Sequence, residues 1–149
     1  GLISGGSSKN TVPAQAHAEL DLRFPTQALC TALWADLHRA ALELGVAGAQ
    51  VELVPQTGRQ PMEKVAGSDA LLQRYAVCAR AHGLGGDEAG RQGGASDGNT
   101  AAAMGIATLD ALGPRGRFFH TPDEYIEVDT LVPKAQALAD FLLASQEKA

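Results

Sequence analysis

Apolar and polar positions alternate early in the chain and then recur at helical spacing. In residues 16–24, small or apolar side chains occupy the even positions and polar or charged ones the odd positions, which is typical of a half-buried β-strand. Residues 26–45 repeat Leu and Ala at helical spacing as far as Leu44, which predicts an amphipathic helix that ends at the next glycine. A further strand is predicted at residues 49–55, and another in the glycine-rich opening. Together these elements predict an open sheet with a helix on one face.

The remainder of the chain has a different pattern. A Pro- and Gly-rich stretch at residues 55–67 predicts a crossing between two structural units. Residues 68–83 are predicted to form a helix with Ser68 as its N-cap, and "GGASDGNTAAAMG" predicts a glycine turn that leads into a short helix. A short buried strand at residues 106–113 and a closing amphipathic helix at residues 129–146 complete the pattern. This α/β unit has too few strands for a sheet of its own.

Composition argues against several classes of protein. The 149 residues include 12 basic and 17 acidic side chains without a Lys or Arg cluster, so a nucleic-acid partner is not expected. No apolar run approaches the roughly 20 residues that cross a bilayer, and no leader opens the chain, so a soluble protein with no membrane partner is expected. Cys30 and Cys78 form no CxxC pair, and both are predicted to be buried thiols.

The sequence "GRFFHTPDEYIEVD" contains one histidine, His120, which has two interpretations. Thr121, Pro122 and Glu124 fit a capping box, with Thr as N-cap, Pro at the first helical position and Glu at the third. In that interpretation His120 is only the residue before a helix. In the other it is a metal ligand, although a lone histidine is not specific evidence for a metal. The local pattern leaves both open.

Other polar residues also have a structural and a functional interpretation. The glycines of "GGASDGN" are typical of a tight turn in which Ser96 or Asp97 caps the following helix, but they also expose backbone N–H groups that suit an anion. Arg23 and Arg59 are individually typical of a surface, whereas as a pair they could hold a carboxylate through bidentate contacts. Asn10 favours a turn. Structural roles are predicted for the remaining histidines, which are His17, His38 and His82.

Four stretches, in this order and spacing, resemble one family. They are "GGSSKNTVPAQAHAELDLRF", "GRQPME", "GGASDGN" and "GIATLDALGP" followed by "HTPDEY". Together they are similar to the C-terminal part of the zinc peptidases that include carboxypeptidase G, aminoacylase, acetylornithine deacetylase and succinyl-diaminopimelate desuccinylase, and they are closest to the carboxypeptidase G-like branch. The resemblance implies a catalytic α/β domain with two zinc ions and an inserted lid domain that makes a homodimer.

By this resemblance, the fold is α/β and has two incomplete parts. Residues 1–55 correspond to a partial lid or dimerisation domain, an open antiparallel sheet with a helix. Residues 56–149 correspond to the C-terminal segment of the catalytic domain. The chain is therefore expected to be a fragment of a larger enzyme.

The resemblance also implies roles for particular residues. His120 matches the last zinc ligand of the family, and the cap that follows would anchor it. Asn10 and Arg23 match a substrate-binding pair of the lid. Arg59 matches the arginine that receives the C-terminal carboxylate of the substrate, and the loop that lines this pocket corresponds to Ser96 and its glycine neighbours, among them Gly94.

The other zinc ligands, the glutamate that acts as general base and the histidine that stabilises the oxyanion lie upstream in the family and have no match here. The implied activity is that of a di-zinc exopeptidase or amidohydrolase that cleaves an amide next to a free carboxylate, in an N-acyl amino acid or a small peptide. This chain alone is expected to be inactive. The alternative is a non-catalytic dimerisation or ligand-binding module derived from the same family. The compartment stays open, with the cytoplasm preferred to the periplasm.

Overall fold

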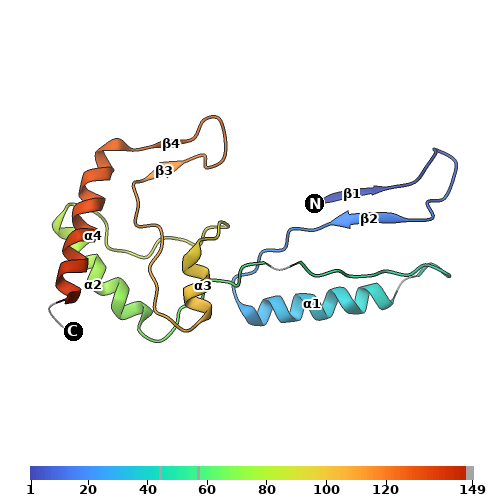
Figure 1. Ribbon diagram of the computed structural model, residues 1–149, viewed down its shortest axis with the longest axis horizontal. Coiled ribbons are helices and arrows are strands. Elements are labelled where there is room, and N and C mark those ends of the chain that lie inside the picture. Colours follow the sequence, from blue (N-terminus) through green and yellow to red (C-terminus); the bar gives the residue numbers. More distant parts are fainter. Residues whose placement is uncertain (44, 57, 147–149) are drawn as a thin grey trace.

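The computed structural model describes residues 1–43, 45–56 and 58–146, and it is a mixed arrangement of helices and small antiparallel sheets. Figure 1 shows the elements in two groups. The N-terminal region, residues 1–56, holds β1 (Leu2–Gly5), β2 (Ala16–Glu19) and α1 (Gln27–Leu42). The C-terminal region, residues 58–146, holds α2 (Ser68–Ala81), α3 (Asp97–Ala103), β3 (Gly116–Arg117), β4 (Tyr125–Ile126), a 3-10 turn η1 (Val128–Thr130) and α4 (Leu131–Gln146).

The strands β1 and β2 form an antiparallel hairpin. Their register runs from Leu2 opposite Glu19 to Gly5 opposite Ala16, which confirms a strand in the glycine-rich opening and the first part of the strand predicted at residues 16–24. Every side chain of the two strands is exposed. The described residues supply no third strand to this sheet, so both of its outer edges are open.

Helix α1 begins where the pattern predicts. Thr26 is its N-cap, and its hydroxyl accepts a hydrogen bond from the Leu29 N–H at 3.2 Å, which satisfies one of the first N–H groups of the helix. The helix ends at Leu42 rather than at Gly45, and Leu44 lies outside the described residues. No other helix or strand of the described residues packs against α1.

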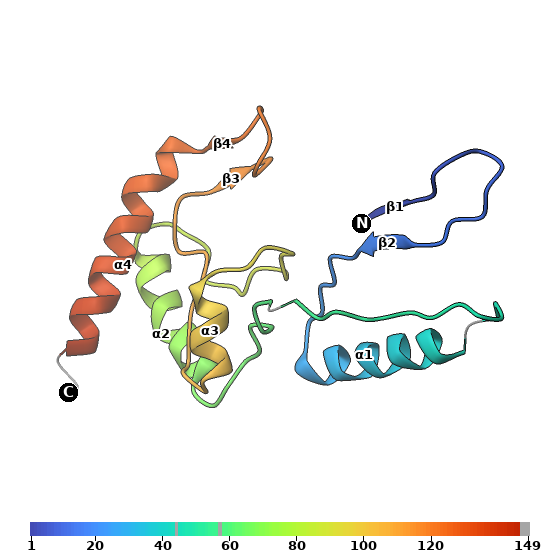
Figure 2. The same cartoon turned by 45° about the vertical axis from the view of Figure 1, so that its right-hand side comes forward.

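The prediction of a strand at residues 49–55 is wrong. This segment is extended and runs back along α1 in both views (Figures 1 and 2), but it pairs with no strand. The alternating sequence favours an extended backbone, yet a β-strand also needs a hydrogen-bonded neighbour. The predicted strand at residues 106–113 is wrong for the same reason, because no strand lies beside it in the described part of the chain.

The core of the C-terminal region lies between α2 and α4. Its buried members are Tyr75, Ala79, Leu84 and Ala137, with Phe141 among the partly buried residues packed against them. The rings of Tyr75 and Phe141 meet edge to face with centroids 5.8 Å apart, a favoured aromatic geometry. Small alanines let the two helices approach closely, and this packing is the main tertiary contact of the molecule.

Two helix starts differ from the sequence prediction. Gly67, with φ of 91°, is the N-cap of α2, and Ser68 is the first helical residue. The Ser68 hydroxyl instead accepts a hydrogen bond from the Val65 N–H at 3.0 Å, so it closes the preceding turn. Asp129 lies within η1, and α4 begins at Leu131. His82 has the predicted structural role: it is the C-cap of α2, and its Nε2 lies 2.7 Å from the Asp140 carboxylate of α4.

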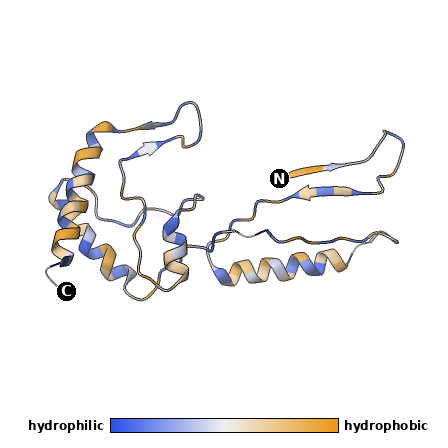
Figure 3. Ribbon diagram, viewed as in Figure 1, coloured by the Kyte–Doolittle hydropathy of each residue, from blue (hydrophilic) through white to orange (hydrophobic). Residues whose placement is uncertain are grey.

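Much of the apolar surface is uncovered. The chain exposes 11771 Å², whereas a compact protein of 15.4 kDa would expose about 7,200 Å². Figure 3 shows apolar residues along β1, where Leu2 and Ile3 are 71% and 83% exposed.

Of the two free thiols, Cys30 is buried as predicted, but Cys78 is only half-buried. Among the described helices, none combines the length and apolar character needed to span a membrane.

Candidate functional site

The first turn of α3 is the best-defined polar site in the structure. Ser96 is its N-cap: the Ser96 hydroxyl accepts a hydrogen bond from the Gly98 N–H at 3.1 Å. In return, the side-chain oxygen of Asn99 accepts a hydrogen bond from the Ser96 N–H at 2.9 Å. This reciprocal capping box satisfies two N–H groups at the helix start. It confirms that the glycine turn leads into a helix and decides in favour of Ser96 as the cap.

The same turn holds the segment that contains Arg59. Arg59 Nη1 lies 2.8 Å from Asp97 Oδ1, and the side-chain nitrogen of Asn99 donates to the Gln60 carbonyl at 2.8 Å. A side chain and a main-chain group of residues 59–60 are therefore both bound by α3. Asp97 is 98% exposed and Arg59 is 49% exposed, so the pair faces solvent.

Close packing also fixes this turn. A Cβ atom built on Gly98 would lie 3.3 Å from both the Met62 sulfur and a Thr108 methyl carbon, which leaves little room for any other residue. The Ser96 hydroxyl in turn donates to the Asp110 carboxylate at 2.8 Å. The start of α3 thus connects the segments around Met62 and Thr108, which are distant in sequence.

The sequence interpretation missed Asn99 and Asp110. Asn99 had a signal, since an amide three residues after a Ser N-cap can complete a capping box as Gln does. Asp110 had none, because its contact with Ser96 depends on how the intervening chain folds back.

Arg23 contacts the glycine loop that precedes α3. Its Nη1 donates to the Gly93 carbonyl at 3.0 Å, and its Nε and Nη2 donate to the Asp21 carboxylate at 3.0 and 2.8 Å. Gly94 is exposed, and a Cβ there would meet no atom within 4 Å. Arg23 thus contacts Gly93, which precedes Gly94, and Arg59 contacts Asp97, which follows Ser96. We call these two arginines together with residues 93–97 the α3 junction. In this structure each arginine binds a carboxylate of the chain itself.

Lys64 adds a further connection near this junction. Its Nζ lies 2.7 Å from the Asp69 carboxylate and 2.8 Å from that of Glu88. The hydrogen bonds with Asp69 and then Glu88 raise the pKa of Lys64 above its usual range. The lysine therefore stays charged and connects the Arg59 segment with α2 and with the loop before α3.

Asn10 and His120 lie elsewhere. Asn10 is in the loop between β1 and β2, where its side-chain oxygen accepts a hydrogen bond from the Ser8 hydroxyl at 3.1 Å. His120 is in the loop between β3 and β4 and is exposed. Both loops lie away from α3 in Figure 1. The structure therefore does not bring these two predicted residues to the junction.

The loop at His120 corrects the predicted helix start. Residues 121–124 form a turn, because the antiparallel pairing of Gly116 with Ile126 brings the chain directly back. The capping groups are still used: the Thr121 hydroxyl donates to the Phe118 carbonyl at 2.7 Å, and the Glu124 carboxylate accepts from the His120 N–H at 3.0 Å. His120 has a φ of 65°, in the left-handed region that few non-glycine residues occupy. Its backbone is held by these contacts.

The described residues do not form a zinc site on their own. Among residues 1–43, 45–56 and 58–146, no group of three or more His, Cys, Asp or Glu side chains could hold a metal ion. A catalytic zinc usually has three protein ligands. His120 could supply at most one of them, and the arrangement of the remaining acids does not complete the set.

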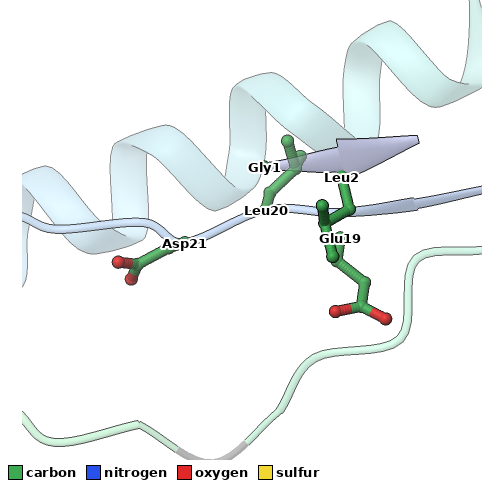
Figure 4. Close-up of a pocket in the computed structure, with 5 residues that line it drawn as sticks. All are labelled: Gly1, Leu2, Glu19, Leu20 and Asp21. Atoms are coloured by element: carbon green, nitrogen blue, oxygen red, sulfur yellow. The ribbon is translucent and has the colours of Figure 1, made fainter.

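A hollow of 340 Å³ lies at the start of the chain, away from all these residues. Its lining comprises Gly1, Leu2, Glu19, Leu20 and Asp21. Figure 4 shows the carboxylates of Glu19 and Asp21 lying apart from each other, so they do not converge on one ligand. None of the predicted site residues lines this hollow.

Comparison with known proteins identifies the family. The model of peptidase family M20/M25/M40 matches residues 3–144. The match spans both regions, so this chain belongs to peptidase family M20/M25/M40, a hydrolase family whose members generally use zinc. No curated protein and no solved structure matches the chain.

Proposed function

We propose that this chain is the carboxylate-recognising part of a zinc-dependent metallopeptidase or amidohydrolase of the carboxypeptidase G-like type. Its substrate is an N-acyl amino acid or a small peptide, and the bond cleaved is an amide next to a free carboxylate. The chain belongs to a hydrolase family. The finer assignment rests on the residues at the start of α3.

The observation that carries the proposal is that Arg59 pairs with a carboxylate and is still partly exposed. Its guanidinium already binds one carboxylate, that of Asp97, at 2.8 Å, while about half of the side chain stays exposed. Guanidinium groups match carboxylates in shape and charge, and such contacts are about twice as strong as neutral hydrogen bonds. The glycine loop and Ser96 directly precede Asp97, the partner of Arg59, along the chain. The junction therefore offers a cation and an exposed glycine loop to a small acidic ligand.

His120 enters the proposal as a single zinc ligand. The contacts of Glu124 with the His120 N–H and of Thr121 with the Phe118 carbonyl hold the main chain at this position. We assign the remaining ligands and the general base to residues outside the described chain, since the described residues do not supply them. Asn10, Arg23, Gly94 and Ser96 complete the proposed substrate site, as the resemblance to the family implies.

The N-terminal region is proposed to be part of a lid domain that mediates a homodimer. In support, β1 and β2 are exposed along their whole length, and their outer edges have no partner among the described residues. Unpaired strand edges are sites for pairing with another chain. Sedimentation analysis that shows only monomers at all accessible concentrations would contradict this part of the proposal.

The test compares two ligands and two variants. N-benzoylglycine and its α-amide are titrated into the chain and into Arg59→Ala. We expect Arg59→Ala to lose about 1.5–3 kcal/mol of binding free energy for the carboxylate, the range for hydrogen bonds to charged groups, and almost none for the amide. Arg39→Ala is the matched control, because Arg39 also pairs with one aspartate, Asp36, but lies on α1. An equal loss for both ligands would show that Arg59 is structural.

A second candidate function is a non-catalytic binding or dimerisation module. The absence of a three-ligand group in the described part of the chain favours it. The two functions differ in the metal content of the complete gene product. Stoichiometric zinc together with hydrolysis of N-acyl amino acids supports the enzyme, whereas ligand binding without zinc supports the module.

A further inference from the structure

We propose that Asp97 is a positioning residue, which orients the Arg59 guanidinium for a carboxylate ligand. This inference rests on the proposed role of Arg59 and adds a residue to the site. Asp97 itself would not touch the substrate. Its effect would be transmitted through the contact between its Oδ1 and Arg59 Nη1, at 2.8 Å.

The contact with Asp97 does not use the Nε and Nη2 atoms of Arg59. Only Nη1 is engaged by Asp97, and Nε and Nη2 make no hydrogen bond within the described residues. In a guanidinium, Nε and Nη2 form the side edge that binds a carboxylate through two parallel hydrogen bonds. Asp97 thus engages Nη1 and leaves the Nε–Nη2 edge without a hydrogen bond among the described residues.

The contacts that hold Arg59 come from a segment that is distant in the sequence. The partners Arg59 and Asp97 are 38 residues apart in sequence, unlike the local pairs of Arg23 with Asp21 and Arg39 with Asp36. The neighbouring Gln60 carbonyl is bound by Asn99 of the same helical turn. The Arg59 side chain and the neighbouring main chain are therefore both bound by one capped turn.

The energetics favour a geometric role. Ion pairs on an exposed surface contribute only about 0–1 kcal/mol to folding, and Asp97 is 98% exposed. A side chain that is already ordered loses less rotational freedom when a ligand binds. The consequence of the pair is therefore expected in ligand affinity more than in stability.

A competing role makes the opposite prediction. If Asp97 occupied the position of the substrate carboxylate, it would have to be displaced, and its removal would strengthen binding. If Asp97 positions Arg59, its removal weakens binding. The sign of the change therefore decides between the two roles.

The experiment is an NMR titration of the 149-residue chain with N-benzoylglycine, followed at the Nε–H group of Arg59, with the α-amide as the parallel ligand. For Asp97→Ala we expect a dissociation constant about twofold to tenfold higher for the carboxylate, from the cost of ordering one side chain, and no change for the amide. Asp97→Asn keeps an oxygen at the position of Oδ1 and is expected to stay within about twofold of wild type. The amide signals of Ser96 and Asn99 report whether α3 is intact in each variant.

Each outcome has a defined meaning. Equal or tighter binding by Asp97→Ala overturns the positioning role, and so does a loss that Asp97→Asn shares in full. If Asp97→Ala disrupts α3, the Asn variant alone decides, because a weakening with α3 intact contradicts the proposal and retained affinity supports it. A loss in Arg59→Ala without any loss in Asp97→Ala rejects only the present inference. No loss in Arg59→Ala rejects the proposed function as well.

Discussion

The two regions of the molecule have similar local structure but very different cores. The N-terminal region contains a hairpin and a 16-residue helix, yet Cys30 is its one buried residue in the described part of the chain. In the C-terminal region, α2 and α4 enclose Tyr75, Ala79 and Ala137. The difference shows that capping and periodicity are enough to define elements, whereas tertiary packing needs facing apolar surfaces from distant segments.

This contrast has a consequence for stability. Most helical stability in proteins comes from packing of an apolar face rather than from propensity. Helix α4 has such packing, while no other helix or strand of the described residues packs against α1, which has the extended segment beside it. We expect the two regions to unfold independently, with the C-terminal region the more stable.

The largest effect is expected from Tyr75→Ala. Tyr75 is 6% exposed and packs against Phe141, and truncation of a buried aromatic residue costs about 3–5 kcal/mol. The loss should appear as early unfolding of α2 and α4 in thermal denaturation, while the amide signals of α1 stay unchanged. Leu42→Ala is the control, because Leu42 is 87% exposed. A simultaneous loss of α1 would show that the regions are coupled.

A smaller effect of opposite sign is expected from Tyr75→Phe. The Tyr75 hydroxyl is buried and has no hydrogen-bond partner among the described residues, and an unsatisfied buried polar group costs about 1–3 kcal/mol. Its removal should therefore stabilise the C-terminal region by about 1 kcal/mol. Destabilisation would indicate that the hydroxyl has a partner after all.

The same variant should also change the pH dependence. Burial raises the pKa of Tyr75 above its usual value, with Cys78 adding to the effect. Because the folded state favours the protonated phenol, this contribution to stability is complete below the ordinary tyrosine pKa of about 10 and is lost as the pH rises through the folded pKa. In Tyr75→Phe, this part of the decrease in unfolding free energy at alkaline pH should be missing. Urea unfolding at a series of pH values from neutral to alkaline would measure the difference.

The smallest effect is expected from Thr26→Ala in the N-terminal region. Loss of the N-cap hydroxyl costs about 0.5–1 kcal/mol, and α1 has little packing to offset it. Hydrogen exchange should therefore accelerate in the first turn of α1, with no change in α2 or α4. Thr26→Ser is the control, since it keeps the hydroxyl that accepts from Leu29. Unchanged exchange in Thr26→Ala would mean that packing holds the helix start.

The sequence predicted the elements that local chemistry determines. The amphipathic pattern and Thr26 define the start of α1, and Ser96 defines that of α3. The predictions that were wrong concern elements whose structure depends on contacts with other segments of the chain. The segments at 49–55 and 106–113 would need a neighbouring strand to form strands themselves. Thr121 with Glu124 closes a hairpin loop instead of beginning a helix.

The resemblance to the zinc peptidases, rather than a local pattern, indicated Arg59, Gly94 and Ser96 as site residues, and their roles stay predictions. The glycine turn did predict that the chain enters a helix here, and Arg59 lies against the first residue of that helix, Asp97. The contacts of Asp97 with Arg59 and of Asp110 with Ser96 follow from the folded path of the chain and have no local pattern. His120 and Asn10 remain in separate loops, and their predicted roles depend on groups that the described residues do not include.

The large exposed area of the folded chain also determines how it responds to denaturant. The dependence of the unfolding free energy on urea concentration scales with the surface newly exposed on unfolding. A chain that already exposes 11771 Å² when folded has less left to expose than a compact protein of its length. Its urea transition should therefore be broad, and a molecule that covers the apolar surface should make the transition steeper. The slope of the curve thus reports whether this surface is covered, whatever the identity of the molecule that covers it.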